Sequence, residues 1–258
     1  MTTHAMPVPV RSPARGFGEL VKVETKIAVR APLGLALGVL LPVIVLVIVG
    51  AIPEMKKLAP GSTLTMFSQY IPVLIGTSLC LIALINLPLS LVTNRQIGVL
   101  RRFATTPAPP AWLLAAQLII NTAVAVMAII ILIAGGVLFF GASLPSQWPG
   151  FVLSVLLATA AMFAIGLLIT AIAPTPQVAG VVGTVLLYPL MFFAGMWIPM
   201  QNMSPLLHHI ADYTPLGAAV QAMDAAMQGS FPPARPLLVM AAYAVVFGAA
   251  AIRWFRWE

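Results

Sequence analysis

Few side chains in this 258-residue sequence are of types that could do acid–base or metal chemistry, and they are scattered. The histidines are His4, His208 and His209, and neighbouring positions on a helix diverge by about 100°, so the last two make a poor metal chelate. The single Cys80 excludes an intramolecular disulfide and a cysteine-based metal cluster. The sequence contains no phosphate-binding loop, dinucleotide fingerprint, zinc-protease motif or nucleophile elbow. We therefore expect no catalytic residue, metal site or cofactor in this chain.

The apolar stretches of the sequence also lack the relays that ion-coupled transporters use. Such relays are carboxylates, lysines or histidines inside the membrane, and the six apolar windows given below contain none of them. The polar groups available there are amides and hydroxyls. Asn86, Asn121 and Tyr188 are our candidates for a transport pathway, and the alternative is that such groups only form hydrogen bonds between helices.

The elements that would position these residues are membrane-spanning helices. No Asp, Glu, Lys or Arg occurs between Arg102 and Asp212, and 61% of the chain is hydrophobic. A helical span needs about 20 apolar residues, and the apolar runs do not alternate as the strands of a β-barrel do. We expect an all-α integral membrane protein with six spans, in the windows Pro32–Pro53, Ile71–Thr93, Ala111–Phe140, Gly150–Ala173, Gln177–Ile198 and Pro236–Ile252.

The basic residues predict an orientation. With six spans, the N-terminal segment, the second loop and the C-terminus lie on one side, which then carries ten of the 13 Lys and Arg residues. Cytoplasmic loops carry the excess of Lys and Arg. We expect both termini to be cytoplasmic and interpret the net charge of +7 as topological rather than as a nucleic-acid-binding surface. Nine Arg against four Lys, with abundant Ala, Gly and Pro, hints at a bacterial genome rich in G and C.

The N-terminal region divides into a tail and an amphipathic helix. Residues 1–14 are rich in Pro, Ser and Thr and are predicted to be disordered, and 15–258 form a single membrane domain. Charged residues recur on one face of 15–30 and apolar residues on the other, which predicts a helix on the cytoplasmic membrane surface. Glu24 projects from its apolar face, so it either tilts to water, pairs with a nearby Lys or Arg, or meets another protein surface.

The segment from Ile198 to Arg235 is too long and too apolar for a simple loop. Ser204-Pro205 and Thr214-Pro215 each place a capping hydroxyl before a proline, which predicts two helix starts. Both helices are too short to span a membrane, so we expect amphipathic helices in the outer leaflet. In the first span, Gly34 and Gly38 form a small-x-x-x-small pair that predicts a close helix contact.

Three stretches of the sequence resemble the permease subunits of type-2 ABC exporters, the group that contains the daunorubicin/doxorubicin-resistance permeases. The stretch NRQIGVLRRFATTPAPP is similar to the family's pattern between spans two and three, with Arg95, Gly98, Leu100, Arg102, Phe103, Thr106 and Pro107 in matching positions. The stretch FFAGMWIPMQNMSPLLHHIADYTPLGAAVQAM is similar to the exit of span five, with Gly195, Pro199, Met203, Pro205, Pro215 and Leu216 in place. The junction Arg30-Ala31-Pro32 is similar to the family's sequence before span one.

The resemblance implies two functional regions. The loop Arg95–Thr106 would be a coupling helix that docks on an ATPase, through Arg95, Gln96, Gly98, Leu100, Arg101, Arg102, Phe103, Thr106 and Pro107. Asn94 and Gln96 replace acidic residues of the family pattern, which implies a larger role in coupling for Arg101 and Arg102, or for Glu24. Glu24 and Arg30 are the candidate site residues of the interfacial helix. The two outer helices would gate the exit, through Gly195, Pro199, Pro205, Pro215, Leu216, Val220 and Met223.

The resemblance also implies a function. Two copies of an ABC ATPase subunit, carrying Mg-ATP, and a second permease, identical or paralogous, would work with this chain in a bacterial inner membrane. The charge-free spans favour a hydrophobic or amphiphilic cargo, such as a drug-like natural product or a lipid. The alternatives are a permease for polysaccharide or glycolipid export, a membrane scaffold that transports nothing, and a cofactor-free membrane enzyme.

Overall fold

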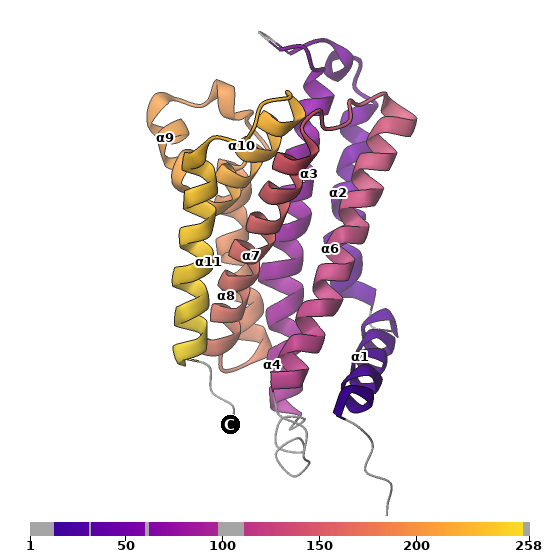
Figure 1. Ribbon diagram of the computed structural model, residues 1–258, viewed down its shortest axis with the longest axis vertical. Coiled ribbons are helices and arrows are strands. Elements are labelled where there is room, and N and C mark those ends of the chain that lie inside the picture. Colours follow the sequence, from indigo (N-terminus) through magenta and orange to yellow (C-terminus); the bar gives the residue numbers. More distant parts are fainter. Residues whose placement is uncertain (1–12, 31, 60–61, 98–110, 255–258) are drawn as a thin grey trace, which may run out of the picture.

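The computed structural model describes residues 13–30, 32–59, 62–97 and 111–254, and these residues are almost entirely helical. They contain no β-strand, and one isolated antiparallel bridge joins Leu58 to Thr65. Most of the helices run side by side along one axis (Figure 1). The helices are α1 Pro13–Arg30, α2 Pro32–Gly50, η1 Pro53–Lys56, α3 Met66–Leu81, η2 Ile82–Asn86, α4 Leu87–Gln96, α6 Ala111–Phe140, α7 Trp148–Ile172, α8 Pro176–Phe193, η3 Met200–Asn202, α9 Pro205–Tyr213, α10 Pro215–Met227 and α11 Ala234–Trp254.

Five helices of the described chain are long and apolar enough to cross a membrane. They are the continuous helix Met66–Gln96, then α6, α7, α8 and α11. The part of α2 from Leu37 to Gly50 is apolar but shorter than a span. The class predicted from the sequence, an all-helical membrane protein, is therefore confirmed, whereas the sixth span at Pro32–Pro53 stays a prediction.

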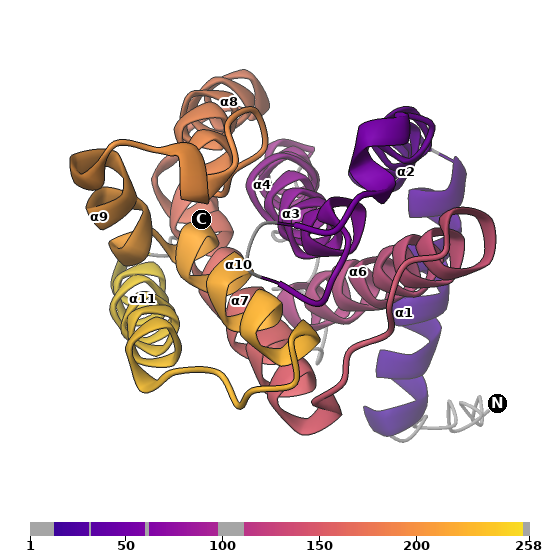
Figure 2. The same cartoon turned by 90° about the horizontal axis from the view of Figure 1, so that it is seen from above.

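The helix formed by α3, η2 and α4 is the centre of the bundle. It lies among α2, α6, α7, α8 and α10 when the molecule is viewed from above (Figure 2), and its residues from Ile71 to Leu84 are all buried. Its middle, η2, is a π turn in which the N–H of Leu87 bonds to the carbonyl of Ile82, five residues back. A single π turn inside an α-helix is common at functional sites.

The π turn brings backbone of the central helix against two glycines. A Cβ on Gly166 of α7 would lie 2.0 Å from the carbonyl oxygen of Ala83, and one on Gly183 of α8 would lie 2.1 Å from that of Leu84. Only hydrogen atoms fit between these backbones, as at the small-residue contacts that join helices in membranes. The two glycines therefore set how closely α7 and α8 approach the central helix.

Helix α2 packs on the central helix through a similar contact. The Ser78 hydroxyl donates a 2.6 Å hydrogen bond to the carbonyl of Gly38, and a Cβ on Gly38 would lie 2.6 Å from the side chain of Ile82. The close contact predicted for the small-residue pair is confirmed at Gly38. Gly34 lies in the same helix, in the part whose side-chain environment is not described.

The bundle has two ends that differ in structure. At the α1 end, α1 crosses the foot of the bundle, and α4, α6 and α11 have their termini there (Figure 1). At the α10 end lie η1, η3, α9 and α10. Helix α1 begins at Pro13, so the last two residues of the predicted disordered tail are helical, and residues 1–12 lie outside the described chain.

The two short helices predicted after Ile198 exist, but α10 differs from its prediction. Thr214 caps α10 by accepting a hydrogen bond from the N–H of Gly217, whereas the Ser204 side chain makes no such bond to α9. Leu216, Val220 and Met223 are at most 5% exposed, because α10 packs between α3, α7 and α11. Helix α10 is therefore a core element and not an amphipathic helix with one face in lipid.

Candidate functional site

At the α1 end, Glu24 is buried against α6 of its own chain. It is 7% exposed, and its Oε2 accepts a 2.7 Å hydrogen bond from Nε2 of Gln117. The Asn94 side chain at the end of α4 also acts on this carboxylate and lowers its pKa. Burial raises the pKa of Glu24, and the two amide donors oppose the rise. The first alternative proposed from the sequence, that this side chain tilts to water, is therefore wrong, whereas pairing with a nearby Lys or Arg and contact with another protein stay predictions.

The hydrogen bonds continue from Gln117 into the bundle. Gln117 Oε1 accepts from Ser90 at 3.2 Å, and its backbone carbonyl accepts from Nδ2 of Asn121 at 2.8 Å. Asn121 Oδ1 then accepts from Nδ2 of Asn86, in the π turn, at 2.7 Å. We call Glu24, Asn86, Ser90, Asn94, Gln117 and Asn121 the polar stripe. The stripe links α1, the central helix and α6.

The spacing of the stripe is visible in the sequence. Asn86, Ser90 and Asn94 are four residues apart, as are Gln117 and Asn121, and residues four apart share one face of a helix. Of the stripe residues, only Asn86 and Asn121 were predicted as pathway candidates. The structure bonds them to each other, which is the interhelical role that was the alternative.

Tyr188, the third pathway candidate, is not part of the stripe. It is exposed on α8, and its ring stacks on Trp197 with centroids 6.3 Å apart. The structure therefore does not bring the three pathway candidates together.

Arg95 of the predicted coupling loop belongs to the last turn of α4 and caps a neighbouring helix. Its guanidinium donates to the carbonyls of Thr170 and Ala173, at the C-terminus of α7. A cation at that position complements the negative end of the helix dipole. Gln96 ends α4 and is exposed. The remaining coupling residues, Gly98, Leu100, Arg101, Arg102, Phe103, Thr106 and Pro107, lie outside the described residues, as does the side chain of Arg30.

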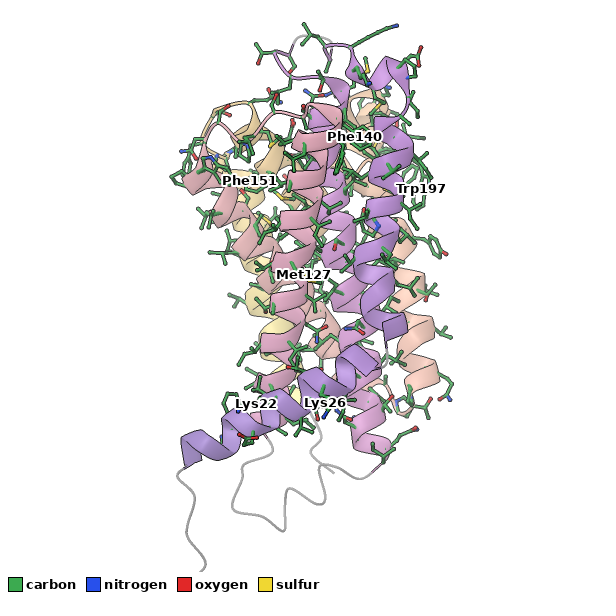
Figure 3. All side chains as sticks on the ribbon, turned by 90° about the vertical axis from the view of Figure 1, so that its right-hand side faces the viewer. Lys22, Lys26, Met127, Phe140, Phe151 and Trp197 are labelled. Atoms are coloured by element: carbon green, nitrogen blue, oxygen red, sulfur yellow. The ribbon has the colours of Figure 1, made fainter. Side chains whose placement is uncertain are left out.

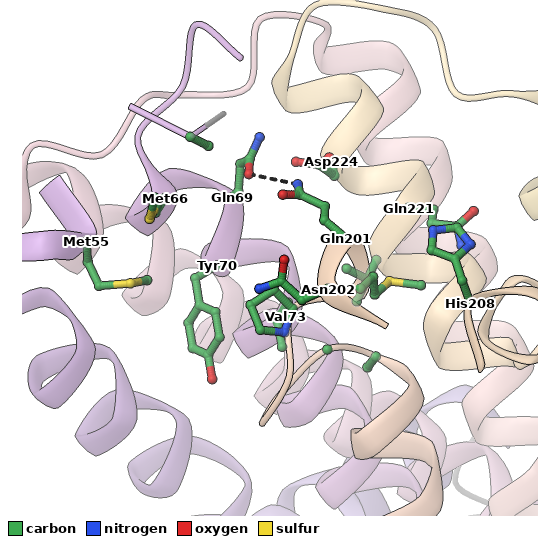
Figure 4. Close-up of a pocket in the computed structure, with 16 residues that line it drawn as sticks. Met55, Met66, Gln69, Tyr70, Val73, Gln201, Asn202, His208, Gln221 and Asp224 are labelled. Carbon is green, nitrogen blue, oxygen red and sulfur yellow. Dashed lines mark hydrogen bonds between the residues drawn. The ribbon is translucent and has the colours of Figure 1, made fainter. Parts of the chain in front are cut away.

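At the α10 end, a cavity of about 320 Å³ opens between α3, η3, α9 and α10 (Figure 4). Three of the predicted gate residues line it, Gly195, Pro199 and Val220. Gly195 adopts a φ of +88°, which glycine tolerates and which turns the chain after α8. Pro205 starts the exposed helix α9, while Pro215, Leu216 and Met223 are buried in α10 behind this lining.

Two hydrogen bonds join the walls of the cavity. The Tyr70 hydroxyl of α3 donates to the carbonyl of Met196 at 2.7 Å. Nε2 of Gln201 donates to Oε1 of Gln69 at 3.3 Å, the bond drawn as a dashed line in Figure 4. The start of the central helix is therefore joined to the chain after α8 at two points of the cavity wall.

A buried carboxylate ties α9, α10 and α11 together at the same end. Asp212 is 4% exposed and accepts hydrogen bonds from Gln221 Nε2 at 2.5 Å and from Arg235 Nη2 at 2.8 Å. His208 Nδ1 lies 3.4 Å from Oδ1 of the same carboxylate. This cluster was not predicted from the sequence, although an acid that ends a charge-free stretch of more than 100 residues was a signal for it.

Replacing Arg235 by leucine is expected to lower the stability of the protein. The change leaves the buried Asp212 carboxylate without its cationic partner, which costs about 1–3 kcal/mol for a charge-assisted hydrogen bond, less than for a fully buried pair because Arg235 is half exposed. The apparent thermal midpoint in detergent measures the loss. Asp212→Asn in the same variant should restore much of it, and Arg253→Leu, at an exposed position of α11, should change little.

The fold defines the class of the protein, a helical membrane protein with several apolar spans. Its described residues contain no cluster of three metal-ligating side chains. The chain matches the profile of the ABC-2 type transporter family over residues 15–227 and belongs to that family. Its members are transmembrane permease components and not ATPases, and the chain is accordingly a permease subunit of an ABC-2 type transporter. No curated protein sequence matches the chain significantly.

Proposed function

We propose that the chain is the permease of an ATP-driven exporter that moves a hydrophobic or amphiphilic cargo out of the cell. Two copies of a separate ABC ATPase subunit, with Mg-ATP, drive the cycle, and a second permease completes the pathway. The cargo class, a drug-like natural product or a lipid, is favoured by the apolar surface of α2, α6, α8 and α11, which offers an amphiphile a route from the bilayer. The protein lies in a bacterial inner membrane with six spans and both termini in the cytoplasm.

The observation that carries the proposal is the attachment of α1 to both helices that flank the predicted coupling segment. Asn94 lies at the end of α4, just before that segment, and Gln117 lies in α6, just after it. Gln117 donates to Glu24 of α1, and the Asn94 side chain also lowers the pKa of that carboxyl group. An ATPase that moved the coupling segment would therefore move α1 and, through Asn121 and Asn86, the π turn of the central helix.

The arrangement of α1 supports its role as an interfacial helix. Figure 3 shows α1 crossing the foot of the bundle at a steep angle to α6. Lys22 and Lys26 are exposed, whereas Phe17 packs edge-on against Trp112 of α6, with ring centroids 5.7 Å apart. A helix with basic residues on one face and apolar residues on the other lies in the membrane interface. In the proposed orientation this interface is the cytoplasmic one.

The proposal is tested with the permease and the ABC ATPase that copurifies with it, reconstituted in vesicles. ATP addition should drive uptake of a fluorescent amphiphile into inside-out vesicles, and omission of either subunit should stop it. Isolation of the permease without any ATPase, together with no ATP-dependent uptake, would favour the scaffold alternative. Product formation from the permease alone without ATP would favour an enzyme.

Reversing the charge of both Arg101 and Arg102 to glutamate is expected to abolish cargo-stimulated ATP hydrolysis. If these residues dock on the ATPase, the change replaces attraction by repulsion at the contact, which costs several kcal/mol. Membrane insertion, measured by yield in the membrane fraction, should be retained. The matched control reverses Lys56 and Lys57, which are exposed at the α10 end of the bundle. If the cargo still stimulates ATP hydrolysis in the arginine variant, Arg101 and Arg102 do not dock on the ATPase and only help to orient the protein in the membrane.

A further inference from the structure

The cavity at the α10 end contains one acidic group whose hydrogen bonding is incomplete. Asp224 of α10 lines the cavity. Its Oδ2 accepts a 2.7 Å hydrogen bond from Nε2 of Gln228, while Oδ1 is buried and has no hydrogen-bond partner within the described chain. Buried polar atoms are nearly always paired. A ligand in the cavity could supply this missing partner.

The charge state of Asp224 points to a cationic partner. Burial raises the pKa of this carboxyl to about 6, against the hydrogen bond from Gln228, which lowers it. The group therefore remains mostly ionised at pH 7.4, in surroundings that stabilise the charge poorly. The residues that line the cavity include no lysine or arginine, and His208 is their only other ionisable group apart from Tyr70.

The rest of the lining indicates the size and chemistry of the partner. A volume of about 320 Å³ is at the lower end of small-molecule sites, which span about 300–1,000 Å³. Met55, Met66 and Met200 provide a flexible apolar wall, and methionine adapts to ligands of different shapes. Gln69 and Gln221 offer amide oxygens that accept hydrogen bonds from an ammonium group.

A metal ion fits this site poorly. Calcium takes six to eight oxygen ligands, several of them carboxylates, and the described residues contain no cluster of three acidic, histidine or cysteine side chains. An ammonium group needs only a few acceptors and brings its own apolar body to the methionine wall.

We propose that this cavity binds an organic ammonium compound with an apolar body, and that Asp224 is the residue that selects its charge. In the exporter, this cavity would be the last site that the cargo occupies before release. That role rests on the proposed function, and it narrows the cargo class to cationic amphiphiles. Binding of the ligand can be tested on the permease alone. Opening of the Gln69–Gln201 contact is the movement that admits or releases the ligand.

The test is calorimetric titration of the full-length permease in nanodiscs, without ATPase or ATP, using 4-phenylbutylammonium and the neutral 4-phenylbutan-1-ol. The two probes have the same apolar body. The ammonium compound should bind at least 10-fold more tightly than the alcohol. Asp224→Asn should abolish this preference and leave alcohol binding unchanged. Glu54→Gln, an exposed acid at the same end of the bundle, should keep the preference and controls for a general surface charge effect.

A second variant keeps the test decisive if Asp224→Asn does not fold. Met66→Trp places a larger side chain in the cavity and keeps the carboxylate. It should weaken the binding of both probes by about 10-fold, the size of effect that a small change in a hydrophobic pocket produces. Equal affinity of the two probes for the unmodified protein, or an ammonium preference that survives Asp224→Asn, would overturn the proposal. Loss of ATP-driven uptake with intact ammonium binding would instead count against the proposed exporter and leave this site standing.

Discussion

Replacing Gly183 by alanine is expected to prevent α8 from packing on the central helix. The added Cβ would lie 2.1 Å from the carbonyl oxygen of Leu84, whereas a carbon and an oxygen in contact need more than 3 Å. The obstacle is backbone, so no side-chain rotation can relieve it. Overpacking typically costs about 1–3 kcal/mol and more where backbone must shift. Fluorescence-detected size-exclusion chromatography in detergent should show loss of the monodisperse peak or a strongly lowered thermal midpoint.

The same helix offers a matched control. Gly180 lies one turn earlier in α8, and a Cβ there would meet nothing within 4 Å. Gly180→Ala should therefore keep the peak and raise helix propensity slightly. Gly166→Ala in α7 should behave like Gly183→Ala, since its Cβ would lie 2.0 Å from the Ala83 carbonyl. Equal stability of the Gly180 and Gly183 variants would show that the close contact at the π turn does not hold the bundle together.

Replacing Gln117 by leucine is expected to uncouple α1 from the bundle. The change removes the 2.7 Å donor to Glu24 and the acceptor of Ser90, so a buried carboxylate keeps only the Asn94 amide. An unsatisfied buried acid costs about 1–3 kcal/mol. With transmission through α1 weakened, ATP-driven uptake in vesicles should fall at least 10-fold, as measured at matched amounts of assembled complex.

Two further variants separate geometry from charge at this position. Glu24→Gln retains an oxygen that accepts from Gln117, so it should keep more than half of the uptake if the hydrogen bond is what matters. Glu19→Gln removes an exposed acid on the same helix, paired with Lys22 at 3.0 Å, and should have no effect. Normal uptake in Gln117→Leu would mean that the polar stripe only packs helices and does not transmit movement.

The predicted gate residues fall into two groups in the structure, those buried in the core and those that face the cavity. Leu216 and Met223 are fully buried, so shortening them would create cavities in the core and lower stability rather than act on an opening alone. Gly195, Pro199 and Val220 face the cavity and are the better positions for testing a gate. The residue that gives the cavity its charge, Asp224, was not among the predicted gate residues.

The sequence alone determined the class of this protein and the approximate place of its helices. Hydropathy and charge are local properties, and a stretch of more than 100 residues without a charge is stable only as helices in lipid. The sequence also predicted the starts of α9 and α10, from their prolines, and the close helix contact at Gly38. Both predictions rest on short local motifs. The family resemblance rested on the same local motifs, and the ABC-2 type transporter family is confirmed over residues 15–227, while the likeness to the daunorubicin/doxorubicin-resistance group stays a prediction.

The tertiary structure alone decided which residues meet. Glu24 and Gln117 are 93 positions apart. The sequence pattern of α1 does not predict that its partner is α6, and the pattern of α6 does not predict that its partner is α1. The burial of α10 could not be predicted from its length or its apolar spacing, since a short apolar helix lies equally well in lipid or against α3, α7 and α11. The incomplete hydrogen bonding of Asp224 exists only once the walls of its cavity are assembled, because the cost of a buried charge depends on every group that packs around it.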